Sequence, residues 1–153
     1  NLGATVGCAI SVMATGRRAT ASHRALAKAI FASVGEVVEL PERLFDAVTA
    51  ISGSGPAYFF LIFQALRDAG LRAGMPKAIA QQLAVQTALG SATLVNGSHE
   101  ELETLIERVA SKKGTTEAAL RVFRQQRLTT ILQAGVLAAA QRSKELSWLL
   151  SKS

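Results

Sequence analysis

The pattern of apolar and polar residues changes near residue 40. Before that point, the segment 5–15 places branched apolar residues among small ones, which predicts a β-strand. Apolar residues then recur at helical spacing, so we expect a helix that is capped by Ser22 and ended by Gly35. The run "EVVEL" at 36–40 predicts a second strand. Strand–helix–strand is the trailing part of an α/β unit and is too small to fold alone.

From Pro41 onward the pattern predicts only helices. A first helix begins at Pro41 and is stopped by the pair Gly53 and Gly55, and Pro56 begins a longer helix. The later helices are separated by breaks at 74–76, 96–98 and 111–114. The segment 77–95 is apolar or small on more than one face. We therefore expect it to be buried on several sides, one of them by a helix of a second subunit.

The predicted fold is mainly α, with a helical bundle over 41–153 that follows a small α/β remnant over 1–40. Hydrophobic residues make up 49% and charged residues 18% of the 153 positions, which is typical of a folded chain. The net charge is +6, but the basic residues are scattered without interleaved aromatics, so nucleic-acid binding is disfavoured. The longest apolar run, 56–66, is about half of the ~20 residues that a spanning helix needs, so we expect no membrane span.

Single residues carry weaker signals. Cys8 is the one cysteine, which excludes an internal disulfide and favours a reducing, cytoplasmic setting, and we interpret it as a core residue. His23 and His99 match no metal spacing, so no metal is expected. Trp148 is interpreted as a docking residue near the tail. The sequence opens "NLGATVG" without an initiator Met, so we expect part of the parent protein to lie outside it.

The turn "SGSGPA" is the first candidate site. Ser52 and Ser54 supply hydroxyls, Gly53 and Gly55 expose backbone N–H groups, and Pro56 opens a helix whose positive end favours anions. One interpretation is an anion-facing helix start that leaves room for a flat ligand. The alternative is a helix–helix corner whose glycines adopt left-handed dihedrals.

The segment "SKKGTTEAAL" is the second candidate. Ser111, Thr115 and Thr116 place three hydroxyls around Gly114 at a predicted helix N-terminus, where free N–H groups can bind a carboxylate. The alternative is an ordinary threonine cap, with Glu117 favoured by the helix dipole.

Taken together, five segments resemble those of pyrroline-5-carboxylate reductases, in the same order. They are 46–60, 68–76, 86–92, 111–120 and 142–146. The resemblance covers nearly the whole chain. It implies reduction of Δ1-pyrroline-5-carboxylate to L-proline with NADPH or NADH. It also implies that 1–40 is the trailing strand–helix–strand of a Rossmann-type cofactor domain, and that 41–153 is a dimerisation and substrate-binding domain.

The resemblance also implies roles for individual residues. The substrate-binding residues would be Glu42, Ser111, Gly114, Thr115 and Thr116. Glu42 would lie near the amine of the product, and the loop residues would hold the carboxylate. Thr49 is the catalytic candidate on the nicotinamide side. The cofactor-binding residues would be Ser52, Gly53, Ser54 and Gly55.

One departure from the family pattern lies in the second motif. Lys112 and Lys113 stand where the family typically has proline and a first glycine. If the loop requires a positive φ at Lys113, a residue with a Cβ costs about 1–2 kcal/mol there. The two cations would either strengthen carboxylate binding or only decorate the surface.

Three functions remain open at this point. The first is the substrate-binding part of a homodimeric reductase, with further assembly into a ring as in the family. The second is a non-catalytic helical oligomerisation protein that kept this fold. The third, a basic nucleic-acid binder, rests on charge alone. Under the first, we expect this chain by itself to be inactive, because nucleotide positioning would come from the cofactor domain.

Overall fold

The computed structural model describes residues 2–152, which form two compact units. The first unit contains the residues up to Ala57 and those from Gln133 onward, and the second contains Tyr58–Leu132. Two long helices, α3 (Gly55–Arg72) and α7 (Leu128–Leu150), contribute residues to both units. These units describe packing within the chain, so the domain boundary predicted at residue 40 stays a prediction.

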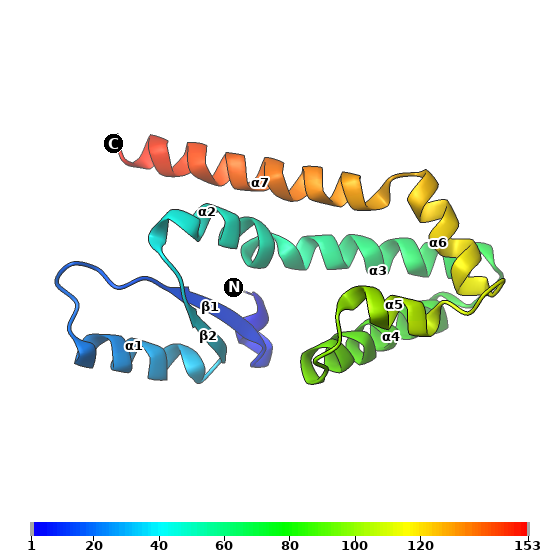
Figure 1. Ribbon diagram of the computed structural model, residues 1–153, viewed down its shortest axis with the longest axis horizontal. Helices are drawn as coiled ribbons and strands as arrows, with labels where there is room; N and C mark the ends of the chain where they lie inside the picture. Colours follow the sequence, from blue (N-terminus) through cyan, green and yellow to red (C-terminus); the bar gives the residue numbers. More distant parts are fainter. Residues whose placement is uncertain (1, 153) are drawn as a thin grey trace. The chain divides into compact units, whose positions relative to one another are not determined.

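The first unit contains a parallel pair of short strands, drawn in blue to cyan in Figure 1. β1 (Ala9–Met13) pairs with β2 (Gly35–Glu39), with Ala9 opposite Gly35. α1 (Ala21–Ala32) connects the two strands and packs against β2. The predicted strand–helix–strand order is confirmed, and with it the small α/β part of a mainly α fold.

The N-terminal cap of α1 differs from the prediction. Thr20, not Ser22, is the N-cap: its hydroxyl accepts the His23 N–H at 3.2 Å, and its own N–H donates to His23 Nδ1 at 3.4 Å. Thr20 has extended dihedrals, whereas Ser22 already lies inside the first helical turn. The two bonds form a capping box with histidine in the place of the usual Glu or Gln.

Gly35 does not end α1, which stops at Ala32. It begins β2 with a φ of 153°, and a Cβ at this position would overlap the backbone of Ala9. A glycine is therefore required where the two strands meet, rather than at the helix end.

Beyond residue 41 the first unit is helical but changes helix type. A 3₁₀ turn, a short α-helix and a π turn follow one another before α3 begins; they are η2 (Glu42–Leu44), α2 (Phe45–Val48) and η3 (Thr49–Gly53). The C-terminal half of α7 joins this unit, where Ser143 Oγ donates to Asp46 Oδ1 at 2.8 Å. That bond spans 97 residues of sequence.

The second unit consists of helices joined by short turns. The predicted breaks are confirmed: after α3 come α4 (Lys77–Gly97), α5 (Leu102–Val109) and α6 (Thr115–Gln125). The turn between α3 and α4 depends on Gly74, whose φ is 90°. The two helices come close at Gly70, where an added Cβ would lie 2.8 Å from Ala80 Cβ.

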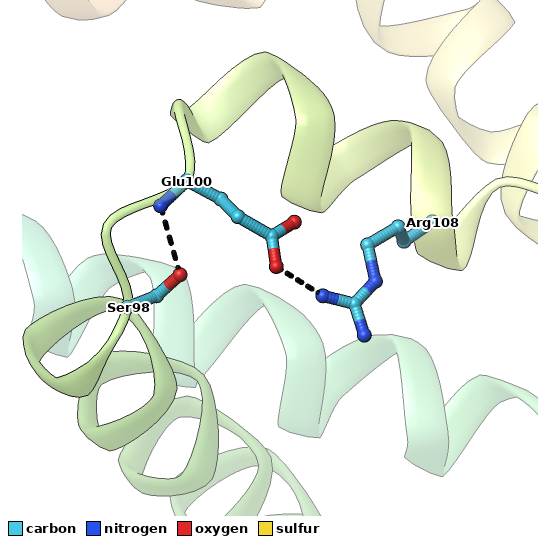
Figure 2. Close-up of polar contacts among 3 residues, drawn as sticks. All are labelled: Ser98, Glu100 and Arg108. Carbon is cyan, nitrogen blue, oxygen red and sulfur yellow. Dashed lines mark hydrogen bonds and ion pairs between the residues drawn. The ribbon is translucent and has the colours of Figure 1, made fainter.

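A small polar cluster fixes the start of α5 (Figure 2). Ser98 Oγ accepts the Glu100 N–H at 3.0 Å, and the Glu100 carboxylate contacts Arg108 Nη1 at 2.5 Å. The loop after α4 is thereby tied to the last turn of α5. The Glu100 and Arg108 side chains are both exposed, so this ion pair contributes little to stability.

Large apolar side chains remain uncovered within the chain. The buried apolar residues of the described chain are all alanines, namely Ala9, Ala50, Ala80 and Ala84. On α4, one face meets α3 through Ala80 and Ala84, while Leu83 and Leu89 are 50% and 57% exposed. Apolar faces of this extent mark interaction surfaces. The burial predicted for α4 on several sides is not supplied by the chain itself.

Cys8 follows a 3₁₀ turn (Leu2–Val6) and is exposed, so its interpretation as a core residue is wrong within this chain. Trp148 on α7 is 56% exposed, and the Lys152 ammonium lies 3.8 Å from the centre of its ring. Across residues 2–152, no helix is both long and apolar enough to cross a membrane. Within the same range, no group of His, Cys, Asp or Glu is placed to hold a metal ion.

Candidate functional site

The candidate residues lie in two segments, one in each compact unit. Residues 42–55 belong to the first unit and residues 111–117 to the second. The two segments contain similar residue types, but they use their hydrogen-bonding groups in opposite ways.

The first segment forms a closed π turn rather than an open loop. The Ser54 N–H donates to Thr49 O at 2.8 Å, and Ser52 Oγ donates to Val48 O at 3.0 Å. The helix that the glycine pair was predicted to stop therefore continues through η3 into α3. The Ser54 N–H is therefore used inside the turn, whereas the N–H groups that were expected to face an anion are those of Gly53 and Gly55.

The two glycines of this turn do not adopt left-handed dihedrals, so the alternative explanation, a corner built on left-handed glycines, is wrong in that respect. A Cβ on Gly53 would lie 3.5 Å from Thr49 Cγ2, which is an ordinary contact. Gly55 is buried, yet a Cβ there would meet nothing within 4 Å. The open space beside Gly55 leaves room for a flat group next to the turn.

Glu42 and Thr49 are both exposed in this segment. Within residues 2–152, neither the Glu42 carboxylate nor the Thr49 hydroxyl takes part in a hydrogen bond or ion pair. Thr49 Cγ2 points toward Gly53, so Thr49 and Gly53 share one face of the π turn. The functional groups of Glu42 and Thr49 are thus available to a ligand.

The second segment is an open turn that precedes α6. The Gly114 N–H donates to Ser111 O at 2.9 Å, and this bond defines the turn. Lys113 has a φ of 59°, in the left-handed region that glycine prefers. The loop therefore does require a positive φ at Lys113, and a residue with a Cβ occupies this strained position. Gly114 itself cannot carry a side chain without change, because a Cβ there would overlap Ser111 Oγ.

The N-terminus of α6 has no side-chain cap. Gly114 is the N-cap residue, so the ordinary threonine cap is wrong as an explanation of this motif. In the described part of the chain, no hydrogen bond uses the hydroxyl or the N–H of Thr115 or Thr116. Thr115 is exposed and Thr116 half-buried. Unsatisfied N–H groups at a helix start, with two hydroxyls beside them, form an arrangement suited to a carboxylate.

A cleft of about 480 Å³ lies along α6, and neither Thr115 nor Thr116 lines it. It is lined by Lys113, Gly114, Glu117, Ala118, Arg121 and Arg124. None of the three cations is in an ion pair within residues 2–152. Lys112 does not line the cleft, so of the two unusual lysines only Lys113 adds a positive charge there.

Glu117 does not play the role expected of it. Its carboxylate accepts a hydrogen bond from the Lys113 N–H instead of acting only through the helix dipole. The sequence also provided no sign of two further features: the bond from Ser143 to Asp46, and the buried Tyr58 hydroxyl, which has no partner among the described residues. Both depend on tertiary packing, which local patterns do not report.

The chain is similar in sequence to one family of known proteins. A family model described as pyrroline-5-carboxylate reductase dimerisation matches residues 42–146. The pyrroline-5-carboxylate reductase of Synechocystis sp. is 45% identical over 146 residues, which are 95% of this chain and 55% of that protein. The Arabidopsis thaliana protein of the same name is 44% identical over 147 residues, or 96% and 53%. The chain spans about half the length of the curated relatives it matches.

Solved structures agree with the fold. A pyrroline carboxylate reductase of Plasmodium falciparum with NADP bound aligns with a TM-score of 0.91 at 29% identity, over 95% of this chain and 58% of that one. A pyrroline-5-carboxylate reductase of Coxiella burnetii aligns with a TM-score of 0.88 at 33% identity, over 93% and 53%.

Proposed function

Because the chain belongs to the pyrroline-5-carboxylate reductase family, we propose that it supplies the dimerising, substrate-binding part of an enzyme that reduces Δ1-pyrroline-5-carboxylate to L-proline. The observation that carries this proposal is the uncapped N-terminus of α6, with the N–H groups and hydroxyls of Thr115 and Thr116 unused within residues 2–152. Such a terminus stabilises a carboxylate, which both substrate and product carry.

The other substrate contacts follow from the free groups of the first segment. Glu42 presents a carboxylate without a partner in the described chain, which would stabilise the cationic nitrogen of the product ring. Thr49 presents a hydroxyl that would hydrogen-bond the ring nitrogen and orient the proton that joins it. Ser111 would support the carboxylate through the turn that it forms with Gly114.

The residues of the π turn fit the uncharged end of a nicotinamide cofactor. Reduced nicotinamide, as NADPH or NADH, supplies the hydride that is added to the imine carbon. The Ser54 hydroxyl has no hydrogen-bond partner within residues 2–152, and a Cβ on the buried Gly55 would meet nothing within 4 Å, while the inward-facing Ser54 N–H makes the turn a poor phosphate site. The loop between β1 and α1 contains the single glycine Gly16 and not the glycine-rich fingerprint that holds a pyrophosphate. We therefore expect calorimetry to detect no NADPH binding to this chain alone.

The uncovered apolar faces support a homodimer. Leu83 and Leu89 on α4, like Leu137 on α7, are at least half exposed within the chain, and a second copy would cover them. Light scattering should give at least twice the 16.1 kDa chain mass, and a ring of dimers would give a larger multiple. A stable, folded monomer at micromolar concentration would contradict this part of the proposal.

The activity is tested by a chimera. The part of the Synechocystis reductase that this chain does not match is joined to the chain, and NADPH oxidation is followed by absorbance with pyrroline-5-carboxylate as substrate. We expect substrate-dependent turnover, and loss of most of it when Thr115 and Thr116 are both replaced by alanine. A folded chimera without turnover, together with a chain that dimerises but binds no L-proline, would support the non-catalytic oligomerisation protein instead.

A further inference from the structure

We propose that Glu117 is a positioning residue for the carboxylate site. By accepting the Lys113 N–H, its side chain holds Lys113 in the left-handed conformation and so fixes the start of α6 where Thr115 and Thr116 present their donors. This inference rests on the proposed function, because the site that it positions is the substrate carboxylate site described above.

The loop before α6 needs a contact that holds Lys113 in its conformation. Lys113 has a φ of 59° although it carries a Cβ, and residues of this kind keep such dihedrals only when their surroundings hold them. The turn from Ser111 to Gly114 supplies one hydrogen bond, but that bond does not involve the Lys113 peptide N–H. The Glu117 carboxylate supplies the contact that does.

The direction of the Glu117 side chain is unusual for its place on α6. An exposed glutamate four residues before an arginine on a helix would ordinarily pair with it, and Arg121 stands at that position. No such ion pair forms within the described residues. The Glu117 side chain turns back toward the loop and makes a charge-assisted hydrogen bond. Glu117 is the third residue of α6, the position of the glutamate in a capping box, but it accepts the N–H of the residue before the N-cap rather than that of the N-cap itself.

The charge of Glu117 does not itself favour a carboxylate ligand. A carboxylate in the first turn of α6 opposes the binding of a second carboxylate nearby, so Glu117 is unfavourable to the ligand as a charge. The cations of Lys113, Arg121 and Arg124 along the same cleft offset it. The favourable contribution of Glu117 must therefore come through geometry. This separates two variants: Glu117→Gln keeps an acceptor without the charge, and Glu117→Ala removes both.

The experiment uses the full 153-residue chain and two measurements, an NMR titration with L-proline and hydrogen exchange of the Lys113 amide. We expect Glu117→Ala to weaken L-proline binding by about tenfold, the size of one lost hydrogen bond. The same variant should speed exchange of the Lys113 amide by at least a similar factor. Glu117→Gln should bind within about twofold of the unmodified chain or more tightly.

Two further variants provide the controls. Glu103→Ala removes a glutamate from the first turn of α5 that has no hydrogen bond in the described chain, so it carries the dipole effect alone. The double variant Lys113→Gly with Glu117→Ala should recover most of the lost affinity, because glycine adopts the left-handed conformation without support. It also keeps the test decisive if Glu117→Ala by itself fails to fold.

Several outcomes would overturn the proposal. Equal losses for Glu117→Ala and Glu103→Ala would reduce Glu117 to a dipole effect. A Glu117→Gln variant as weak as Glu117→Ala would show that charge, and not the acceptor, matters. If the double variant did not recover L-proline affinity, the loss in Glu117→Ala would not come from the conformation of Lys113. If the unmodified chain binds no L-proline, the substrate site itself is rejected, whereas unchanged Lys113 exchange in Glu117→Ala rejects the positioning role alone.

Discussion

The two glycine-containing segments of this chain, 49–55 and 111–117, differ in what their donors do. Both combine glycine with serine or threonine hydroxyls just before a helix. In the first, the Ser54 N–H and the Ser52 hydroxyl bond to carbonyls of the preceding turn. In the second, the helix starts without a side-chain cap and its first donors stay free within the described residues. Similar residue types therefore yield one closed turn and one open one.

The cause is what precedes each segment. Before residue 49 the chain is already helical, so carbonyls stand within reach of each new N–H, and one extra residue is absorbed as a π turn. Before residue 111, α5 has ended and Ala110 has left the helical region. α6 must then begin anew, and a new helix start always leaves unsatisfied donors. The availability of donors depends on the preceding backbone more than on glycine content.

The largest predicted effect compares the hydroxyls of the two segments in ligand binding. Thr116→Ala should weaken L-proline binding by at least about tenfold, because a hydrogen bond to a charged group contributes about 1.5–3 kcal/mol. Ser54→Ala should leave L-proline binding within about twofold, because the closed turn is not expected to hold the carboxylate. NMR titration of both variants measures the difference. Thr104→Ala on α5, an exposed threonine also in a first turn, is the control. Equal losses for Thr116→Ala and Ser54→Ala would remove the functional distinction between the segments.

The helices were predictable from sequence because apolar spacing and the breaks at Gly74 and Gly97 are local signals. The π turn was not, because its hydrogen bonds depend on whether the helix before the glycines continues. The exposure of Cys8 was missed for another reason: hydrophobic residues predict burial, but not whether the cover comes from the same chain. The left-handed Lys113 followed from comparing its position with a glycine pattern, since a lysine by itself carries no such signal.

A second comparison tests the backbone of the two segments through their glycines. Gly114→Ala should destabilise the fold by about 1–3 kcal/mol, because its Cβ would overlap Ser111 Oγ and lie 3.0 Å from Ser111 O. Gly53→Ala should be neutral or stabilising by about 0.5–1 kcal/mol, because its Cβ meets only an ordinary contact in a helical turn. Urea denaturation at matched protein concentration measures both. A Gly53→Ala variant as destabilised as Gly114→Ala would show that the π turn is not as open on that side as described.

The smallest effect concerns the sign of a glycine substitution. Lys113→Gly should stabilise the chain by about 0.5–1 kcal/mol, because relief of the left-handed strain, about 1–2 kcal/mol, exceeds the entropic cost of glycine. Ser54→Gly should have the opposite sign and cost about 0.5–1 kcal/mol, because Ser54 already has helical dihedrals, with φ −85° and ψ −21°. Arg127→Gly, at a φ of 54° between α6 and α7, is the control for strain relief away from both segments and should also stabilise. Thermal unfolding of the three variants at one concentration decides the signs. If Lys113→Gly destabilised the chain while Arg127→Gly stabilised it, the lysine would be making contacts in the open segment that exceed the strain of its backbone.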